Sequence, residues 1–170
     1  DYSMCFHNAF VIKTGGKKRN LFFFFLRETD SDFYLEDAIM KWEIPTASIL
    51  YRSKYALEYP TWMARIYSGD LSLSFILLMN GKGRYINAFM SVYNLQIKGN
   101  SMTSIALKKK KTFVSEQHKK LISSLYQMPQ LTDSSKKAIE RKLENLNITI
   151  EYSDMKERKI WWKLFYKKEL

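Results

Sequence analysis

The chain has 170 residues and carries 28 Lys and Arg against 17 Asp and Glu, a formal net charge of +11. Hydrophobic residues make up 46% of it, which excludes a disordered chain and predicts a single domain. Its longest uncharged apolar run is too short to span a membrane, so we expect no membrane segment. The only cysteine is Cys5, which excludes an internal disulfide and favours the nucleus or cytosol. Because residue 1 is Asp, we expect a piece of a longer protein.

The first part of the chain predicts a hairpin followed by a short helix. Residues 5–13 and the apolar run at 21–26, which holds four consecutive phenylalanines, are expected to be strands. The turn between them contains two glycines and three basic residues, Lys17, Lys18 and Arg19. Residues 29–32 predict a turn or a helix cap. A short helix is expected within 33–43, and Pro45 ends it.

The middle of the chain predicts further strands. Residues 47–55 and 62–67 are rich in aromatic and apolar side chains and are expected to be strands. The run at 71–79 is apolar, and a long strand is expected at 84–98. Asn-Gly at residues 80–81 lies between these two segments and predicts a type I′ hairpin turn, because that turn needs positive φ angles.

After a last strand at 101–107, the pattern changes from strand to helix. Four consecutive lysines at 108–111 predict a loop, because like charges repel. A helix is expected from a Ser115 cap to residue 127, and Pro129 ends it. Its apolar stripe is Leu121, Ile122 and Leu125.

Two more helices are expected after Pro129. The first begins at an Asp133 cap and runs to about residue 146. Its inward residues are Ala138, Ile139, Leu143 and Leu146. Residues 147–152 predict a short strand or an extended link. In a final helix at 154–168, we expect Trp161, Leu164 and Phe165 to face protein, either the rest of this chain or a second copy.

Strands followed by helices predict an α+β fold. Five or six strands in a chain of this length are typical of an OB-like, partly open β-barrel, whose strand faces and loops are where such folds bind oligonucleotides. We expect the barrel at residues 1–112 and a C-terminal helical layer packed on it at 113–170, the two together forming one domain.

Aromatic and basic residues are interleaved between residues 51 and 67, which favours single-stranded nucleic-acid binding. Aromatic rings stack on bases, and Lys and Arg neutralise phosphates. The candidate binding residues are Arg52, Lys54, Tyr55, Tyr59, Trp62, Arg65, Lys82 and Arg84, with the basic turn Lys17, Lys18 and Arg19. The alternative is that these aromatics belong to the core or to a protein-protein interface, with the basic face incidental.

Catalytic and metal-binding signals are weak in this sequence. Two histidines and one cysteine cannot build a His/Cys metal site. An acidic cluster could hold Mg²⁺, but acidic residues also suit the N-terminus of a helix. Its members are Asp30, Asp32, Glu36 and Asp37. We therefore expect no enzyme activity, no metal and no cofactor.

The chain resembles the OB-fold domains of the budding-yeast telomere-capping single-stranded DNA-binding protein. The resemblance lies in residues 6–14 with 20–30, in 66–98 and in 115–128, about half of the chain. It implies binding of single-stranded telomeric DNA in the nucleus, a homodimer, and association with other OB-fold subunits. Without it, the cytoplasm is the expected location.

A second likeness concerns residues 75–83, which are similar to methyl-adenosine readers of the YTH type. The spacing of the tryptophans that form the cage of those readers is not matched here. The likeness of residues 75–83 implies an RNA-reader domain as an alternative. A protein-protein interaction or homodimerisation module without direct nucleic-acid binding is the other alternative that the sequence leaves open.

Overall fold

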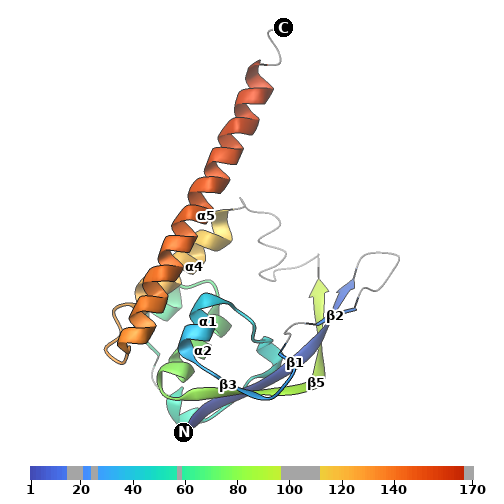
Figure 1. The fold of residues 1–170 in the computed structure, drawn as a ribbon, viewed down its shortest axis with the longest axis vertical. Helices are drawn as coiled ribbons and strands as arrows, with labels where there is room; N and C mark the ends of the chain where they lie inside the picture. The colour runs from blue at the N-terminus through green and yellow to red at the C-terminus, as the bar shows by residue number, and fades with distance from the viewer. Residues whose placement is uncertain (15–20, 24–26, 57–58, 97–111, 167–170) are drawn as a thin grey trace.

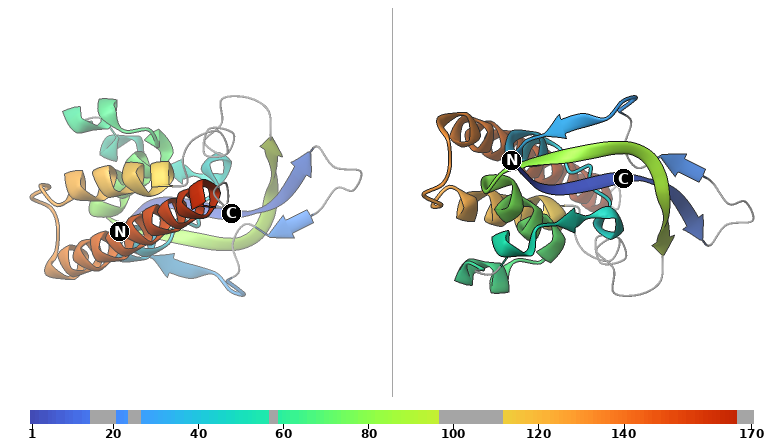
Figure 2. Two further views of the ribbon diagram at one scale, coloured as in Figure 1. Left: turned by 90° about the horizontal axis from the view of Figure 1, so that it is seen from above. Right: turned by 90° about the horizontal axis from the view of Figure 1, so that it is seen from below.

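The computed structural model describes residues 1–14, 21–23, 27–56, 59–96 and 112–166, and their side chains except at 13–14, 21–23, 94–96 and 157–166. Within these ranges the fold is α+β. An open mixed sheet lies at one side, α1 and α2 lie next to it, and α4 and α5 lie beyond them (Figure 1). The turned views in Figure 2 show α5 and the sheet on opposite sides of the molecule.

Two long parallel strands form the centre of the sheet, β1 (Tyr2–Thr14) and β5 (Lys82–Gln96). The strand order is β2-β1-β5-β3, and the described strands do not close into a barrel. Three short strands pair antiparallel to this centre: β2 (Leu21–Phe23) and β4 (Leu50–Tyr51) with β1, and β3 (Ser31–Phe33) with β5. The predicted first hairpin is therefore confirmed as β1 and β2, whereas its basic turn lies outside the described residues.

The predicted hairpin around Asn80 is wrong, because the apolar run before it is a helix. Helix α2 spans Gly69–Met79, and seven of its eleven residues are buried. A helix buried on most sides has no polar stripe, so its sequence cannot be told from that of a buried strand by periodicity. Asn80 ends the helix instead of making a turn between strands, since its side-chain amide donates to the carbonyl of Ile76 at 2.8 Å.

The strand predicted at 47–55 is confirmed only at the two residues of β4, and the one predicted at 62–67 is wrong. These segments are short 3-10 turns, η1 (Thr46–Ser48), η2 (Ser53–Tyr55) and η3 (Thr61–Arg65), with only the two-residue β4 among them. Two of these turns begin directly after a proline. Pro45 precedes η1 and Pro60 precedes η3, and the carbonyl of each proline accepts the first hydrogen bond of the turn. The strand predicted at 101–107 and the lysine loop lie outside the described residues.

Helix predictions succeed where an amphipathic stripe is present. The helix expected within 33–43 is α1 (Leu35–Met40), and the one expected at 115–127 is α4 (Thr112–Leu125). The predicted stripe of α4 is buried, as are Ile139 and Leu146 of α5. Among the described residues, no helix is both long and apolar enough to cross a membrane.

The break predicted at 147–152 is wrong, because α5 (Asp133–Tyr166) is one continuous helix. Asn, Thr and Ile have weak helix propensity, but propensity costs only tenths of a kcal/mol per residue once a long helix is established. Thr149 also bonds within the helix, donating to the carbonyl of Asn145 at 2.8 Å. The N-terminal cap is Thr132 rather than Asp133, since the Thr132 hydroxyl accepts from the amide of Ser135 at 3.1 Å.

One continuous core joins the sheet to the C-terminal helices. The rings of Phe6 and Phe33 meet edge to face with centroids 5.0 Å apart, and Tyr85 lies 5.5 Å from Phe6. The same cluster of buried residues includes Leu121 and Ile139 from α4 and α5. The helical layer is therefore part of the core and not an appendage.

His118 of α4 is partly buried within this helical layer. It lines a cavity of about 30 Å³ together with residues of α1 and α2 and with Lys142 of α5. Lys142 donates to the carbonyl of Met40 at the end of α1, at 2.7 Å. Burial lowers the pKa of His118, and the charge of Lys142 lowers it further.

This environment makes the stability of the protein dependent on pH. The unfolded chain binds a proton at His118 near its ordinary pKa of about 6.5, whereas the folded protein binds it only at lower pH. The free energy of unfolding should therefore fall as the pH drops below that value. Urea unfolding between pH 8 and pH 5 measures this, and His118→Gln should flatten the curve. Equal slopes for the two proteins would contradict it.

Candidate nucleic-acid interface

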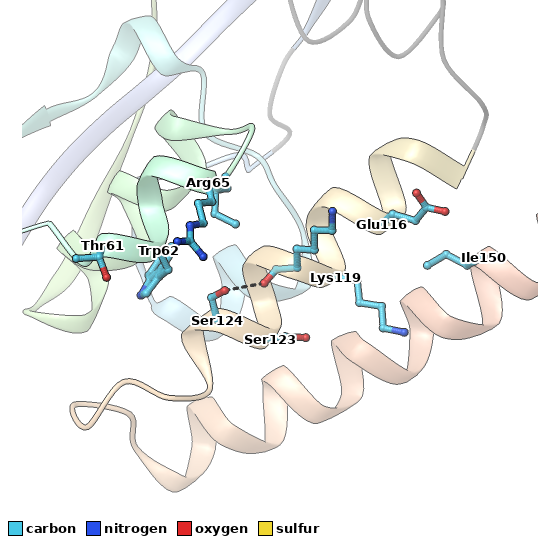
Figure 3. Close-up of a pocket in the computed structure, with 10 residues that line it drawn as sticks. Thr61, Trp62, Arg65, Glu116, Lys119, Ser123, Ser124 and Ile150 are labelled. Carbon is cyan, nitrogen blue, oxygen red and sulfur yellow. Dashed lines mark hydrogen bonds between the residues drawn. The ribbon is translucent and has the colours of Figure 1, made fainter.

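A groove of about 970 Å³ lies between η3 and α4, with α5 at its far side (Figure 3). We call it the η3–α4 groove. Segment η3 contributes Thr61, Trp62 and Arg65 to its lining, and α5 contributes Ile150. Helix α4 contributes Glu116, Lys119, Lys120, Ser123 and Ser124. Two of the eight candidates that lie in described segments, Trp62 and Arg65, meet here.

The amphipathic pattern of α4 explains why its charged side faces the groove. Leu121, Ile122 and Leu125 are buried on the core side of the helix. At 3.6 residues per turn, Lys119 and Ser123 lie on the opposite side. In Figure 3 the Lys119 side chain extends from α4 toward α5. The short serine side chains next to the lysines leave the space that forms the groove.

The groove carries uncompensated positive charge. Its ionisable lining consists of three cations, Arg65, Lys119 and Lys120, and one anion, Glu116. Arg65 and both lysines are solvent-exposed. Among the residues that the structure describes, none of these three cations forms an ion pair with a carboxylate. Such a set can neutralise the phosphates of a bound anion without first losing a protein partner.

Trp62 provides an aromatic surface at the same place. It is half-buried and packs against the core cluster, which fixes the position of its ring. Its indole Nε1 is enclosed and has no hydrogen-bond partner among the described residues. A ring held in this way can present part of its face to a ligand at little cost in conformational entropy.

The structure does not bring Lys82 and Arg84 to this groove. The Lys82 ammonium donates to Asp32 at 2.6 Å, and the Arg84 guanidinium donates to the same carboxylate at 3.2 Å. Arg84 also lies 3.9 Å from Asp30. Hydrogen bonds from Lys82, Tyr2 and Arg84 hold the pKa of Asp32 well below its usual range. Both cations are therefore largely neutralised by protein carboxylates.

The remaining described candidates lie apart from the groove. The Arg52 guanidinium donates to the carbonyl of Tyr2 at 2.8 Å. Lys54 lies over the ring of Tyr55, 4.7 Å from its centroid, and both line a second pocket of about 260 Å³. Tyr59 is 50% exposed.

Six further predicted residues have side chains outside the part of the chain that the structure describes. Lys17, Lys18 and Arg19 lie outside the described residues. Trp161, Leu164 and Phe165 lie in α5, but their side chains are outside the described set.

The acidic cluster near α1 is used for pairing within the protein. The Asp37 carboxylate accepts from the amide of Tyr34 at 2.9 Å and so caps α1, and Arg27 lies 3.5 Å from it. Glu36 accepts from the Ser135 hydroxyl at 2.7 Å. Among the described residues, no group of His, Cys, Asp and Glu has an arrangement that could hold a metal ion.

Lys119 and Lys120 were not among the sequence candidates. The sequence feature that could have identified them is that they are adjacent lysines on the side of the predicted helix opposite its apolar stripe. The sequence could not show that this side faces Trp62, because residues 62–67 were expected to be a strand. Comparisons with protein-family models, curated proteins and solved structures find no match to this chain.

The ion-pair cluster at Asp32 predicts a measurable loss of stability on substitution. Asp32→Asn should lower the free energy of unfolding at pH 7, because Lys82 and Arg84 lose their shared carboxylate. A carboxyl group with a lowered pKa stabilises above its unfolded pKa of about 3.9 and loses this effect as pH falls below it. The difference from the original protein should therefore shrink between pH 4 and pH 2 in thermal unfolding.

Asp133→Asn is the matched control for this substitution. The Asp133 carboxylate is 96% exposed and lies 3.9 Å from Lys136 within one helical turn. An exposed pair of this kind contributes little to stability. Equal effects of the two substitutions at pH 7 would show that the Asp32 cluster is unimportant.

Proposed function

We propose that this chain binds single-stranded nucleic acid in the η3–α4 groove, with DNA favoured over RNA. The observation that carries the proposal is the meeting of Trp62 and Arg65 with Lys119 and Lys120 around one groove. The residues come from elements more than fifty positions apart in the sequence, so no local feature of the chain explains their meeting. The proposal assigns binding to the groove and no catalytic step.

The groove suits a single strand better than a small anion. Its volume of about 970 Å³ is at the upper end of the range for small-molecule sites, which run to roughly 1,000 Å³. It combines an aromatic ring with cations on two sides, the pairing that stacks a base while neutralising adjacent phosphates. An apolar contact from Ile150 extends the lining onto α5.

The narrower parts of the proposal rest on the sequence resemblance. These are an OB-type barrel, single-stranded DNA at chromosome ends, a nuclear location and association with other OB-fold subunits. The proposed binding in the groove depends on none of them, since the residues that line the groove are what support it. An RNA-reader role is distinguished by whether the groove prefers RNA to DNA of the same sequence.

Charge removal in the groove should weaken binding more than charge removal elsewhere. Arg65→Ala and the double variant Lys119→Ala with Lys120→Ala should each lower affinity for a labelled, mixed-sequence single-stranded DNA. The slope of log affinity against log salt should decrease by about 0.7 for each phosphate contact that is lost. Fluorescence anisotropy at several salt concentrations measures both quantities, with RNA titrated in parallel.

Lys137→Ala is the matched control for these variants. Lys137 is an exposed lysine on α5 that does not line the groove. Lys137→Ala removes one positive charge from the protein as a whole, as Arg65→Ala does and as each half of the double variant does. If it weakens binding as much as Arg65→Ala, binding depends on net charge and the groove is not the site. No binding of either nucleic acid at low salt would refute the proposed function.

A further inference from the structure

Helix α5 has a second apolar side that points away from the body of the protein. Its inward side holds Ile139, Leu146 and Ile150, the first two buried. Ile148 and Tyr152 lie about half a helical turn away from that row. Together with Met155 they form a stripe spaced four and three residues apart, and we call these three residues the outward stripe.

The outward stripe is open to solvent. Its three side chains are 58%, 55% and 55% exposed, in chain order. From residue 151 onward, none of the α5 side chains that the structure describes is buried. Figure 1 shows this part of the helix extending beyond the other elements. Such a segment gains little stability from helix propensity alone, because most helix stability in proteins comes from packing.

We propose that the outward stripe is the interface for a second copy of this chain, with the two α5 helices packed antiparallel. A spacing of four and then three residues is the pattern with which two helices pack side by side. The proposal goes beyond nucleic-acid binding and does not depend on it, because the η3–α4 groove uses the opposite side of α5.

The distribution of charge along α5 favours a second copy of this helix as the partner, and it favours antiparallel packing. Residues 143–154 contain three acidic residues and no basic one, whereas residues 155–166 contain four basic residues and one acidic. An antiparallel pair places each acidic segment against the basic segment of its partner. A parallel pair would place like charges together.

A register with Tyr152 opposite Met155 of the second copy also pairs the charges that border the stripe. It brings Glu151 of one copy opposite Lys156 of the other. Lys156 already lies over the Tyr152 ring, with its ammonium 4.7 Å from the centroid. The lysine is thus held beside the stripe, where it can meet the glutamate of the partner.

Sedimentation equilibrium of the full chain tests the interface. The expected result is a species of twice 20.2 kDa for the original protein. Ile148→Asp with Met155→Asp should return it to the monomer without changing the circular dichroism spectrum, because both positions are exposed. Leu50→Asp, at a residue 71% exposed on β4, is the matched control and should remain a dimer. A monomer at every soluble concentration would overturn the proposal.

Charge exchange and disulfide trapping test the pairing. Glu151→Lys and Lys156→Glu should each weaken the dimer, and the two together should restore it. In a Cys5→Ser background, Ile148→Cys should not form a linked dimer. The antiparallel register separates these residues by eleven positions, about 16 Å along the axis, too far for a disulfide. A mixture of Tyr152→Cys and Met155→Cys chains should link.

These tests separate failure of the interface from failure of the proposed function. A linked Ile148→Cys dimer would overturn the antiparallel arrangement. Nucleic-acid affinity of the monomeric variant for a short strand should be unchanged, since Ile148 and Met155 do not line the groove. A monomeric protein that binds normally refutes only the dimer, and a stable dimer that binds no nucleic acid refutes only the proposed function.

Discussion

The parallel pairing of β1 with β5 is the constraint on which the rest of the structure depends. Parallel neighbours cannot be joined by a tight turn, so the chain between them must cross a face of the sheet. That crossing contains α1, the 3-10 segments and α2, and it delivers the last turn of α2 directly to the start of β5. The aromatic cluster of Phe6, Phe33 and Tyr85 lies where the crossing meets the sheet. Helices α4 and α5 then cover the crossing elements instead of the sheet.

The sequence predicted the elements whose local signals agree with their environment. The first hairpin, α1 and α4 were predicted correctly because turn residues between apolar runs, or an amphipathic stripe, indicated them. Helix α2 was missed because burial on most sides removes the stripe from its sequence, and Asn80 then suggested a turn that the fold does not make. The continuity of α5 through Ile148 and Thr149 was missed because local propensity is a small term beside the stability of the established helix. The open sheet could not be predicted, because the segments before and after Asn80 were interpreted as the two strands of a hairpin.

The candidate site shows why net charge can favour a class of partner in a prediction but cannot locate a binding surface. Lys82 and Arg84 belong to the same basic sequence as Arg65, yet Asp32 and Asp30 neutralise them in the folded protein. Asp32 is fifty residues away in the chain, so the sequence contained no sign of this pairing. Conversely, Lys119 and Lys120 gain their significance only from the 3-10 turn that faces them. What could be predicted was the chemistry, an aromatic ring beside cations. The choice of residues required the fold.

The two sides of α5 connect the groove to the outward stripe. Ile150 contributes to the groove, whereas Ile148, only two residues earlier, points to the opposite side of the same helix. A rigid helix that supports a groove on one side and a second copy on the other would fix the relative position of two grooves. Two linked sites on one strand raise the effective concentration of the second binding event. Longer strands should therefore gain affinity from dimerisation, whereas strands that fill a single groove should not. The length of the ligand thus distinguishes a dimer that merely stabilises α5 from one that contributes to binding.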